Sequence, residues 1–218
     1  MYFPYFRGKQ YELLTIRETA PVLAASKFIP IIEPVKQALG GLERSLDAVC
    51  DAEGQAIVII NPYHGDHSSA GDGISALLKS EYSGKAGIGT GILLKENMTA
   101  DAVADLFKKH DEQPCTLVHA GFTNAKSLAD ALGDELPKMR HVFFEDFCGK
   151  LYRKHFSDSE RVLLRDGFER RRNRDHPFVE SFSDLHVTFP EEGMNGFGDF
   201  LIAGDDYTEG GGPAYAVA

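Results

Sequence analysis

The fold can be inferred from one short segment, Lys27-Phe-Ile-Pro-Ile-Ile-Glu33-Pro34. Residues 28–32 carry no charged or hydrogen-bonding side chain. Both faces of this segment should therefore be buried, as in a parallel strand that is covered by helices. Glu33 and Pro34 end the apolar run, because a proline cannot extend the strand and favours the start of a helix. The segment predicts a buried strand that carries a carboxylate at its carboxyl end.

The same pattern occurs three more times along the chain. Largely apolar runs over residues 56–60, 116–119 and 141–144 end in Asn61, in Ala120-Gly121 and in Glu145-Asp146. Parallel strands place their carboxyl ends at one edge of a sheet, and ligands bind beyond that edge in α/β barrels and in open α/β sheets. We therefore expect any functional site of this chain to lie at that shared edge.

Strand-like and helix-like segments alternate along most of the chain. Pro21 is expected to break or restart the first helix, and residues 185–189 are strand-like by their alternation. Eight strands that alternate with helices predict an α/β protein, a (β/α)8 barrel of the TIM-barrel type, with a doubly wound open parallel sheet as the alternative. The expected strands cover residues 2–6, 27–33, 56–60, 86–94, 116–119, 141–144, 161–164 and 200–203, and the expected helices cover 10–25, 35–50, 74–82, 101–110 and 125–132.

The size, composition and charge of the chain limit the classes to which it can belong. Its 218 residues suffice for a single α/β domain over 1–218, with an irregular basic and aromatic insertion around residues 147–184. No apolar run approaches the roughly 20 residues that cross a bilayer, and residues 1–7 lack the features of a signal peptide. We therefore expect a cytoplasmic protein with no membrane partner. The net charge of −10 argues against general coating of nucleic acid.

The end of the chain has an unusual composition for a terminus. Residues 214–218, Ala-Tyr-Ala-Val-Ala, resemble the start of a strand and carry no polar tail. Either this end is tucked into a sheet, or the chain is a fragment of a longer protein, and we favour the fragment. The barrel would then be incomplete at its carboxyl terminus.

Ionisable side chains are concentrated at the expected strand ends. Carboxylates could act there as acids or bases, or could hold Mg²⁺ or Mn²⁺, which take oxygen ligands. Arginine and lysine could hold a phosphate group, and a histidine could move protons near neutral pH. The candidate catalytic residues are Glu33, His119, Glu145 and Asp166, the candidate metal ligands are Glu33, Glu145 and Asp205, and the candidate anion-binding residues are Arg7, Lys9, Arg165, Arg170, Arg171 and Arg172.

These groups are compatible with two kinds of function. One is an enzyme that performs metal-assisted phosphoester chemistry on an anionic, phosphate-bearing small molecule. The other is a non-catalytic component that binds a protein or a nucleic acid through residues 61–73 and through the arginines of residues 165–174, which lie beside Phe168, Phe178 and Phe182. Solvated strand ends and a solvated basic loop would produce the same pattern. Convergence of the charged groups in one pocket is the observation that would favour the enzyme.

The glycine-rich segments do not match known nucleotide-binding loops. Residues 68–73 lack the Gly-Lys-Ser/Thr ending of a phosphate-binding loop. Gly87-Ile-Gly89-Thr-Gly91 lies within an expected strand, unlike a dinucleotide-binding fingerprint. We interpret these strand glycines as positions of close packing inside a barrel. His64 and His67 form a pair that is too sparse to predict a zinc site.

Four segments of the chain carry a family resemblance. They are residues 1–14, Phe28-Ile-Pro-Ile-Ile-Glu33-Pro34, the run from Phe182 to Phe200, and Gly212-Pro-Ala-Tyr-Ala-Val-Ala218. In these segments the chain resembles the phage beta-protein-like family of bacteria and phages. The resemblance covers most of the chain and implies that the chain corresponds to the N-terminal portion of a member. It also implies an association with phage defence or mobile elements, and it supplies no catalytic residues.

Overall fold

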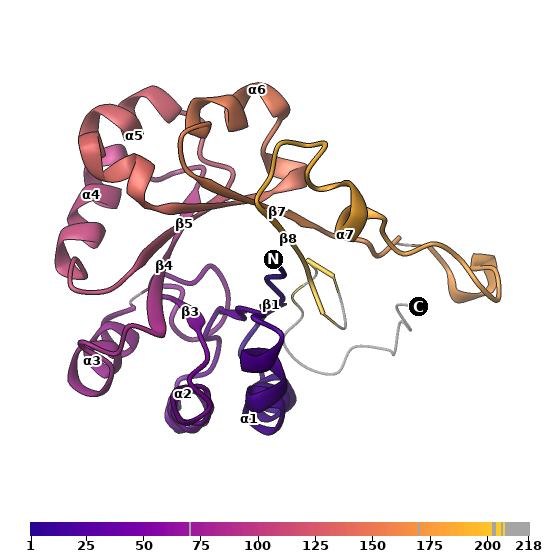
Figure 1. Ribbon diagram of the computed structural model, residues 1–218, viewed down its shortest axis with the longest axis horizontal. Coiled ribbons are helices and arrows are strands. Elements are labelled where there is room, and N and C mark those ends of the chain that lie inside the picture. The colour runs from indigo at the N-terminus through magenta and orange to yellow at the C-terminus, as the bar shows by residue number, and fades with distance from the viewer. Residues whose placement is uncertain (70, 170, 202–203, 206, 208–218) are drawn as a thin grey trace.

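Eight parallel strands form the centre of the structure, which is a computed structural model that describes residues 1–69, 71–169, 171–201, 204–205 and 207 (Figure 1). The strands are β1 (Tyr5–Phe6), β2 (Ile31–Ile32), β3 (Ala56–Ile59), β4 (Ile88–Lys95), β5 (Cys115–Ala120), β6 (Arg140–Phe144), β7 (Glu160–Arg165) and β8 (Gly196–Asp199). Each strand pairs in parallel with the next one along the chain.

The sheet closes almost completely into a barrel. Bridges join Tyr2 to Phe197 and Tyr5 to Phe200, so the last strand lies beside the first. The chain therefore has a TIM-barrel-like (β/α)8 fold, as the alternation of segments predicts. The alternative of a doubly wound open sheet is wrong, because in such a sheet the two edge strands do not meet.

Helices on the outside of the barrel connect the strands. Figure 1 shows α1 to α6 arranged around the outer face of the sheet. No helix of the described residues is long and apolar enough to cross a membrane. The helices are α1 (Gln10–Ala25), α2 (Gly40–Asp51), α3 (Asp72–Glu81), α4 (Ala100–Lys109), α5 (Ala125–Leu132), α6 (Lys150–Arg153) and α7 (Leu185–Thr188), and the short 3-10 helices are η1 (Gly133–Lys138), η2 (Glu145–Phe147), η3 (Lys154–Phe156) and η4 (Asn173–Asp175).

The strand side chains alternate between two apolar layers. One set, which we call the barrel core, points into the barrel, and the other set packs against the helices and forms the outer layer. Because both faces of the sheet are covered, the central residues of most strands are apolar without alternation, and this is why residues 28–32 were recognisable. The barrel core consists of Phe3, Tyr5, Ile29, Ile31, Ile57, Ile59, Leu93, Val118, Val142, Phe144, Val162, Leu164 and Phe200.

Glycines in β4 and β8 allow the barrel core to pack closely. A Cβ atom added to Gly91 would lie 2.6 Å from Ile59 Cδ1 and 3.1 Å from Ile57 Cγ2. A Cβ atom added to Gly198 would lie 2.2 Å from the carbonyl oxygen of Phe3. These distances are shorter than a carbon contact allows, so only glycine fits without a shift of its neighbours. The interpretation of Gly91 as a close-packing position is confirmed.

Two expectations about the helices are wrong. Helix α1 continues through Pro21 to Ala25 instead of breaking there. Pro21 is exposed, so water can hydrate the carbonyl group that its missing N–H leaves unpaired. The second helix begins at Gly40 instead of residue 35, because the preceding residues contact another loop, where Asp66 N donates to Val35 O at 3.0 Å and Asp66 Oδ2 accepts from Gln37 N at 2.7 Å.

The C-terminal elements also differ from the expectation. Residues 185–188 form helix α7 and not a strand, because four residues are too few for a strand period to be told from a helical turn. Strand β8 lies at Gly196–Asp199 instead of residues 200–203, of which 202–203 are outside the described residues. Within the expected insertion around 147–184, strand β7 confirms the strand expected over 161–164, and the described residues between β7 and α7 are irregular apart from the short 3-10 helix η4. This part projects away from the barrel (Figure 1).

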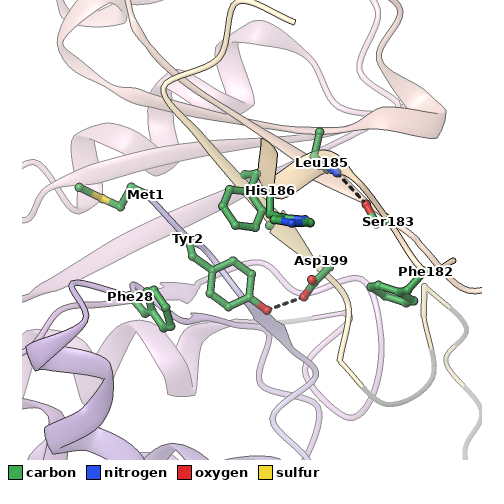
Figure 2. A pocket seen from close by; sticks show the side chains of 10 residues that line it. Met1, Tyr2, Phe28, Phe182, Ser183, Leu185, His186 and Asp199 are labelled. Carbon is green, nitrogen blue, oxygen red and sulfur yellow. Dashed lines mark hydrogen bonds between the residues drawn. The ribbon is translucent and has the colours of Figure 1, made fainter. Parts of the chain in front are cut away.

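An apolar groove of about 480 Å³ lies beside β8 and the start of the chain. Figure 2 shows Tyr2, Phe28 and Leu185 around it, and Tyr2 Oη donates a hydrogen bond to Asp199 Oδ1 at 2.6 Å. In a (β/α)8 barrel the helix that follows the eighth strand covers this part of the outer layer. Among the described residues, no helix follows β8.

Candidate functional site

The carboxyl ends of the strands surround a pocket of about 770 Å³, which we call the mouth pocket. A second hollow of about 530 Å³ shares His64, Phe147 and Asp205 with it and extends to Asp146 and Asp166. The two hollows together form the open end of the barrel, where the strand pattern predicts a site. The side chains of the mouth pocket used below are Arg7, Tyr63, His64, Lys95, Glu96, Phe147 and Asp205.

Glu33 lies beneath the mouth pocket and is fully buried. Its Oε2 accepts hydrogen bonds from Tyr5 Oη at 2.9 Å and from Arg7 Nη1. Its Oε1 accepts hydrogen bonds from the backbone N–H groups of Tyr63 at 2.7 Å and His64 at 3.1 Å. Four donors therefore use the lone pairs of this carboxylate. Glu33 holds together β1, β2 and the loop after β3, and it has no exposed oxygen with which to reach a ligand.

Arg7 links the residues that follow the last strand of the barrel to the first two strands. Its Nη2 forms an ion pair with Asp205 Oδ1, and its Nη1 forms the ion pair with Glu33. Asp205 is held further by its backbone N–H, which donates to Asp166 Oδ2 at 2.9 Å. Burial raises the pKa of Asp205, and the Arg7 guanidinium opposes that rise. Arg7 thus joins the residues after β8 to β1 and β2, where the barrel closes.

The remaining acidic candidate, Glu145, is also engaged by an arginine. Glu145 Oε2 accepts from Arg165 Nε at 2.6 Å and Oε1 accepts from Arg165 Nη2 at 3.2 Å. Arg165 Nη1 contacts Asp184 at 2.9 Å. Glu33, Glu145 and Asp205, the expected metal ligands, therefore each face a guanidinium. Among the described residues, no group of three His, Cys, Asp or Glu side chains is placed to hold a metal ion.

His119 lies away from the mouth. It is fully buried in the outer layer, where its ring stacks on Phe143 with the centroids 4.6 Å apart. The neighbouring Val118 faces the barrel core instead. The expectation that His119 reaches the rim is corrected, because a shift of one residue in a strand moves a side chain to the opposite face.

A chain of hydrogen bonds fixes the protonation of two buried histidines. His141 Nε2 lies 3.1 Å from the carbonyl oxygen of Leu136 and must donate to it. Burial favours the neutral form of both rings. In neutral rings, His141 Nδ1 accepts from His119 Nε2 at 3.0 Å and His119 Nδ1 accepts from Tyr152 Oη at 2.8 Å. Burial lowers the pKa of His141 to about 4 and lowers the pKa of His119 well below its usual value, with His141 adding to the second effect.

Of the basic candidates, Arg7 lines the mouth pocket and Lys9 lies beside the second hollow, whereas Arg171 and Arg172 lie on the projecting segment. Lys9 Nζ lies 5.0 Å from the ring centroid of Tyr207. Arg171 pairs with Glu169 and with Glu180 on its own projecting segment. Arg172 is exposed, and Arg170 is outside the described residues. The arginine-rich segment therefore carries its own acidic partners.

The loop that follows β3 is tied to its surroundings. His67 is buried, and its Nε2 lies 3.1 Å from the carbonyl oxygen of Lys36. His64 instead faces the mouth pocket, and its ring stacks on Tyr207 with the centroids 4.6 Å apart. Burial lowers the pKa of His64, while Glu33 opposes this effect. His64 therefore provides a neutral imidazole at the mouth near pH 7.

Lys95 is a residue of the site that the sequence analysis missed. It is the last residue of β4, and its Nζ donates to the carbonyl oxygen of Pro62 at 2.8 Å. The Nζ atom also lies 5.2 Å from the ring centroid of Tyr63. Lys95 forms no ion pair with another described residue. Burial lowers the pKa of its amine, and the more distant Glu33 partly opposes this. The pattern of strand ends would have found Lys95 if the strand expected over 86–94 had been followed to its next residue.

Searches of protein-family models, of curated proteins and of solved structures found no match to this chain. The resemblance to the phage beta-protein-like family thus stays an expectation.

Proposed function

We propose that the mouth pocket binds an anionic small molecule that has a planar or apolar part, with a carboxylate or a phosphate as the anionic group. The observation that carries the proposal is the Lys95 ammonium, which faces the pocket without an acidic partner among the described residues. Burying a cation without a counter-charge is unfavourable. An anionic ligand would supply the missing charge.

The walls and the size of the pocket support the same class of ligand. Aromatic rings of Tyr63, Phe144 and Phe147 line it, and such rings favour planar ligands by stacking. Its volume of about 770 Å³ lies within the range of roughly 300–1,000 Å³ that is typical of small-molecule sites. The arrangement combines a few charged groups with aromatic walls, which is how most small-molecule sites achieve specificity.

The proposal does not include the metal-assisted chemistry that the strand ends suggested. The carboxylates that such chemistry needs are bonded to Arg7 and Arg165, and a guanidinium competes with a metal for the same oxygens. Binding of a nucleic acid by the projecting segment has weaker support, because Arg171 and Arg174 contact acidic residues of that segment.

Isothermal calorimetry with three aromatic compounds tests the proposal. Phenyl phosphate and 4-(hydroxymethyl)benzoate carry an anionic group, and benzyl alcohol is the neutral control. We expect the two anions to bind, and Lys95→Met to weaken both at least tenfold, which corresponds to about 1.4 kcal/mol. Lys95→Arg should retain binding because it keeps the charge.

Lys108→Met is the matched control for the loss of one positive charge, because Lys108 is exposed near the C-terminal end of α4. It should leave both affinities unchanged. Failure of both anions to bind, or equal affinity in wild type and Lys95→Met, would refute the proposal.

A further inference from the structure

The amine of Lys95 differs from an ordinary surface lysine in three respects. It is half-buried at the end of a barrel strand, it lies beside an aromatic ring, and it has no carboxylate partner among the described residues. A carboxylate would hold the amine in its charged form. Its absence, together with burial, makes the Lys95 ammonium easier to deprotonate than that of a surface lysine, and only the neutral amine has a lone pair with which to attack carbon.

The geometry around Nζ leaves room for such a reaction. The contact with the carbonyl oxygen of Pro62 needs only one N–H bond, and a neutral amine has two. The contact can therefore persist while the lone pair is directed into the mouth pocket, which Lys95 lines. Burial lowers the pKa of Lys95 from its usual value, which increases the neutral fraction at a given pH.

We propose that Lys95 Nζ forms an imine with the carbonyl group of an aldehyde or ketone bound in the mouth pocket. This proposal rests on the proposed function, because the carbonyl compound must first enter the same pocket. It narrows the ligand class to anionic compounds in which a reactive carbonyl group, and not the anionic group itself, lies against Nζ after the ligand has entered the pocket.

The reaction is balanced without any oxidant or reductant. The Nζ lone pair forms a bond to the carbonyl carbon while the C=O π electrons move to oxygen, which takes a proton and becomes the hydroxyl of a carbinolamine. The nitrogen loses its two protons, the hydroxyl leaves as water after taking up one proton, and a C=N bond forms. One water molecule is released in total. His64 lines the same pocket, and its neutral imidazole can exchange these protons with water.

Reductive trapping tests the proposal on the full chain. The protein is incubated with 4-carboxybenzaldehyde and cyanoborohydride, which reduces the imine to a stable secondary amine, and the labelled lysines are identified by peptide mass spectrometry. We expect Lys95 to carry at least ten times more adduct than any other lysine. Lys95→Arg should lose this adduct, and the wild-type protein should bind 4-(hydroxymethyl)benzoate, the carbonyl-free analogue.

The outcomes separate this proposal from the proposed function. Adduct spread evenly over the exposed lysines, with 4-(hydroxymethyl)benzoate still bound, overturns the imine and leaves the anion site intact. Preferential labelling of Lys95 by neutral benzaldehyde as strongly as by 4-carboxybenzaldehyde supports the imine and refutes the need for an anion. The distribution of label in the wild-type protein is informative even if a variant fails to fold.

Discussion

Replacing Glu33 with glutamine is expected to destabilise the fold by about 3–5 kcal/mol. The carboxylate is fully buried and accepts from two donors on each oxygen. A glutamine amide has one oxygen and one NH₂ group, so in either orientation at least one of these donors would face another donor. If the NH₂ group replaces Oε2, Arg7 loses its acceptor. If the NH₂ group replaces Oε1, the backbone N–H groups of Tyr63 and His64 lose theirs.

The magnitude follows from the burial of this cluster. Breaking a buried ion pair by removing one partner costs about 3–5 kcal/mol, and leaving buried donors unsatisfied costs about 1–3 kcal/mol each. A typical domain is stable by only about 5–15 kcal/mol. Glu33→Gln should therefore remove a large part of the stability, although the substitution changes few atoms.

Urea denaturation, followed by circular dichroism, measures this change. Glu96→Gln is the matched control, because Glu96 is an exposed glutamate of the same pocket, and it should change the stability by no more than about 0.5 kcal/mol. A loss below about 1 kcal/mol for Glu33→Gln would show that the four hydrogen bonds do not hold the barrel together. The carboxylate would then be free to act as the catalytic group that the strand pattern suggested.

Two further predictions concern the buried layers. The folded pKa of His141, about 4, lies below its usual value of 6.5, so the unfolded chain binds more protons between these values and stability falls as the pH drops through this window. Urea unfolding should show a loss of about 2 kcal/mol from His141 between pH 7 and pH 5, at about 1.4 kcal/mol per pH unit below 6.5, and a flat profile would contradict the neutral histidine pair. Gly91→Ala should cost about 1–3 kcal/mol by overpacking, since the new Cβ would lie 2.6 Å from Ile59 Cδ1. Gly149→Ala, where nothing lies within 4 Å of the added atom, is the control, and equal stability of the two variants would contradict the packing argument.

Local patterns were sufficient to predict the architecture and the edge of the barrel at which the mouth pocket lies. Residues 28–32 are apolar without alternation, which happens when both faces of a strand are covered, and this property is visible in composition alone. Gly91 within an apolar strand signalled close packing for a similar reason. Because parallel strands end at one edge, Arg7 and Asp205 were correctly expected to lie at the same mouth.

The roles of individual side chains depended on contacts between distant residues. Arg7 forms an ion pair with Asp205, which lies 198 positions further along the chain. The two residues were candidates for ligand contact, and their ion pair instead holds the barrel closed. In β5 both faces are buried, so no apolar–polar alternation indicated that Val118 points inward and His119 outward. Lys95 became a candidate only in the folded structure, because the lack of an ion-pair partner among the described residues depends on which side chains surround it in space. A continuous apolar run is a local consequence of burial, and it predicts the strands. The pairing of charges is set only when closure of the barrel brings the last strand beside the first.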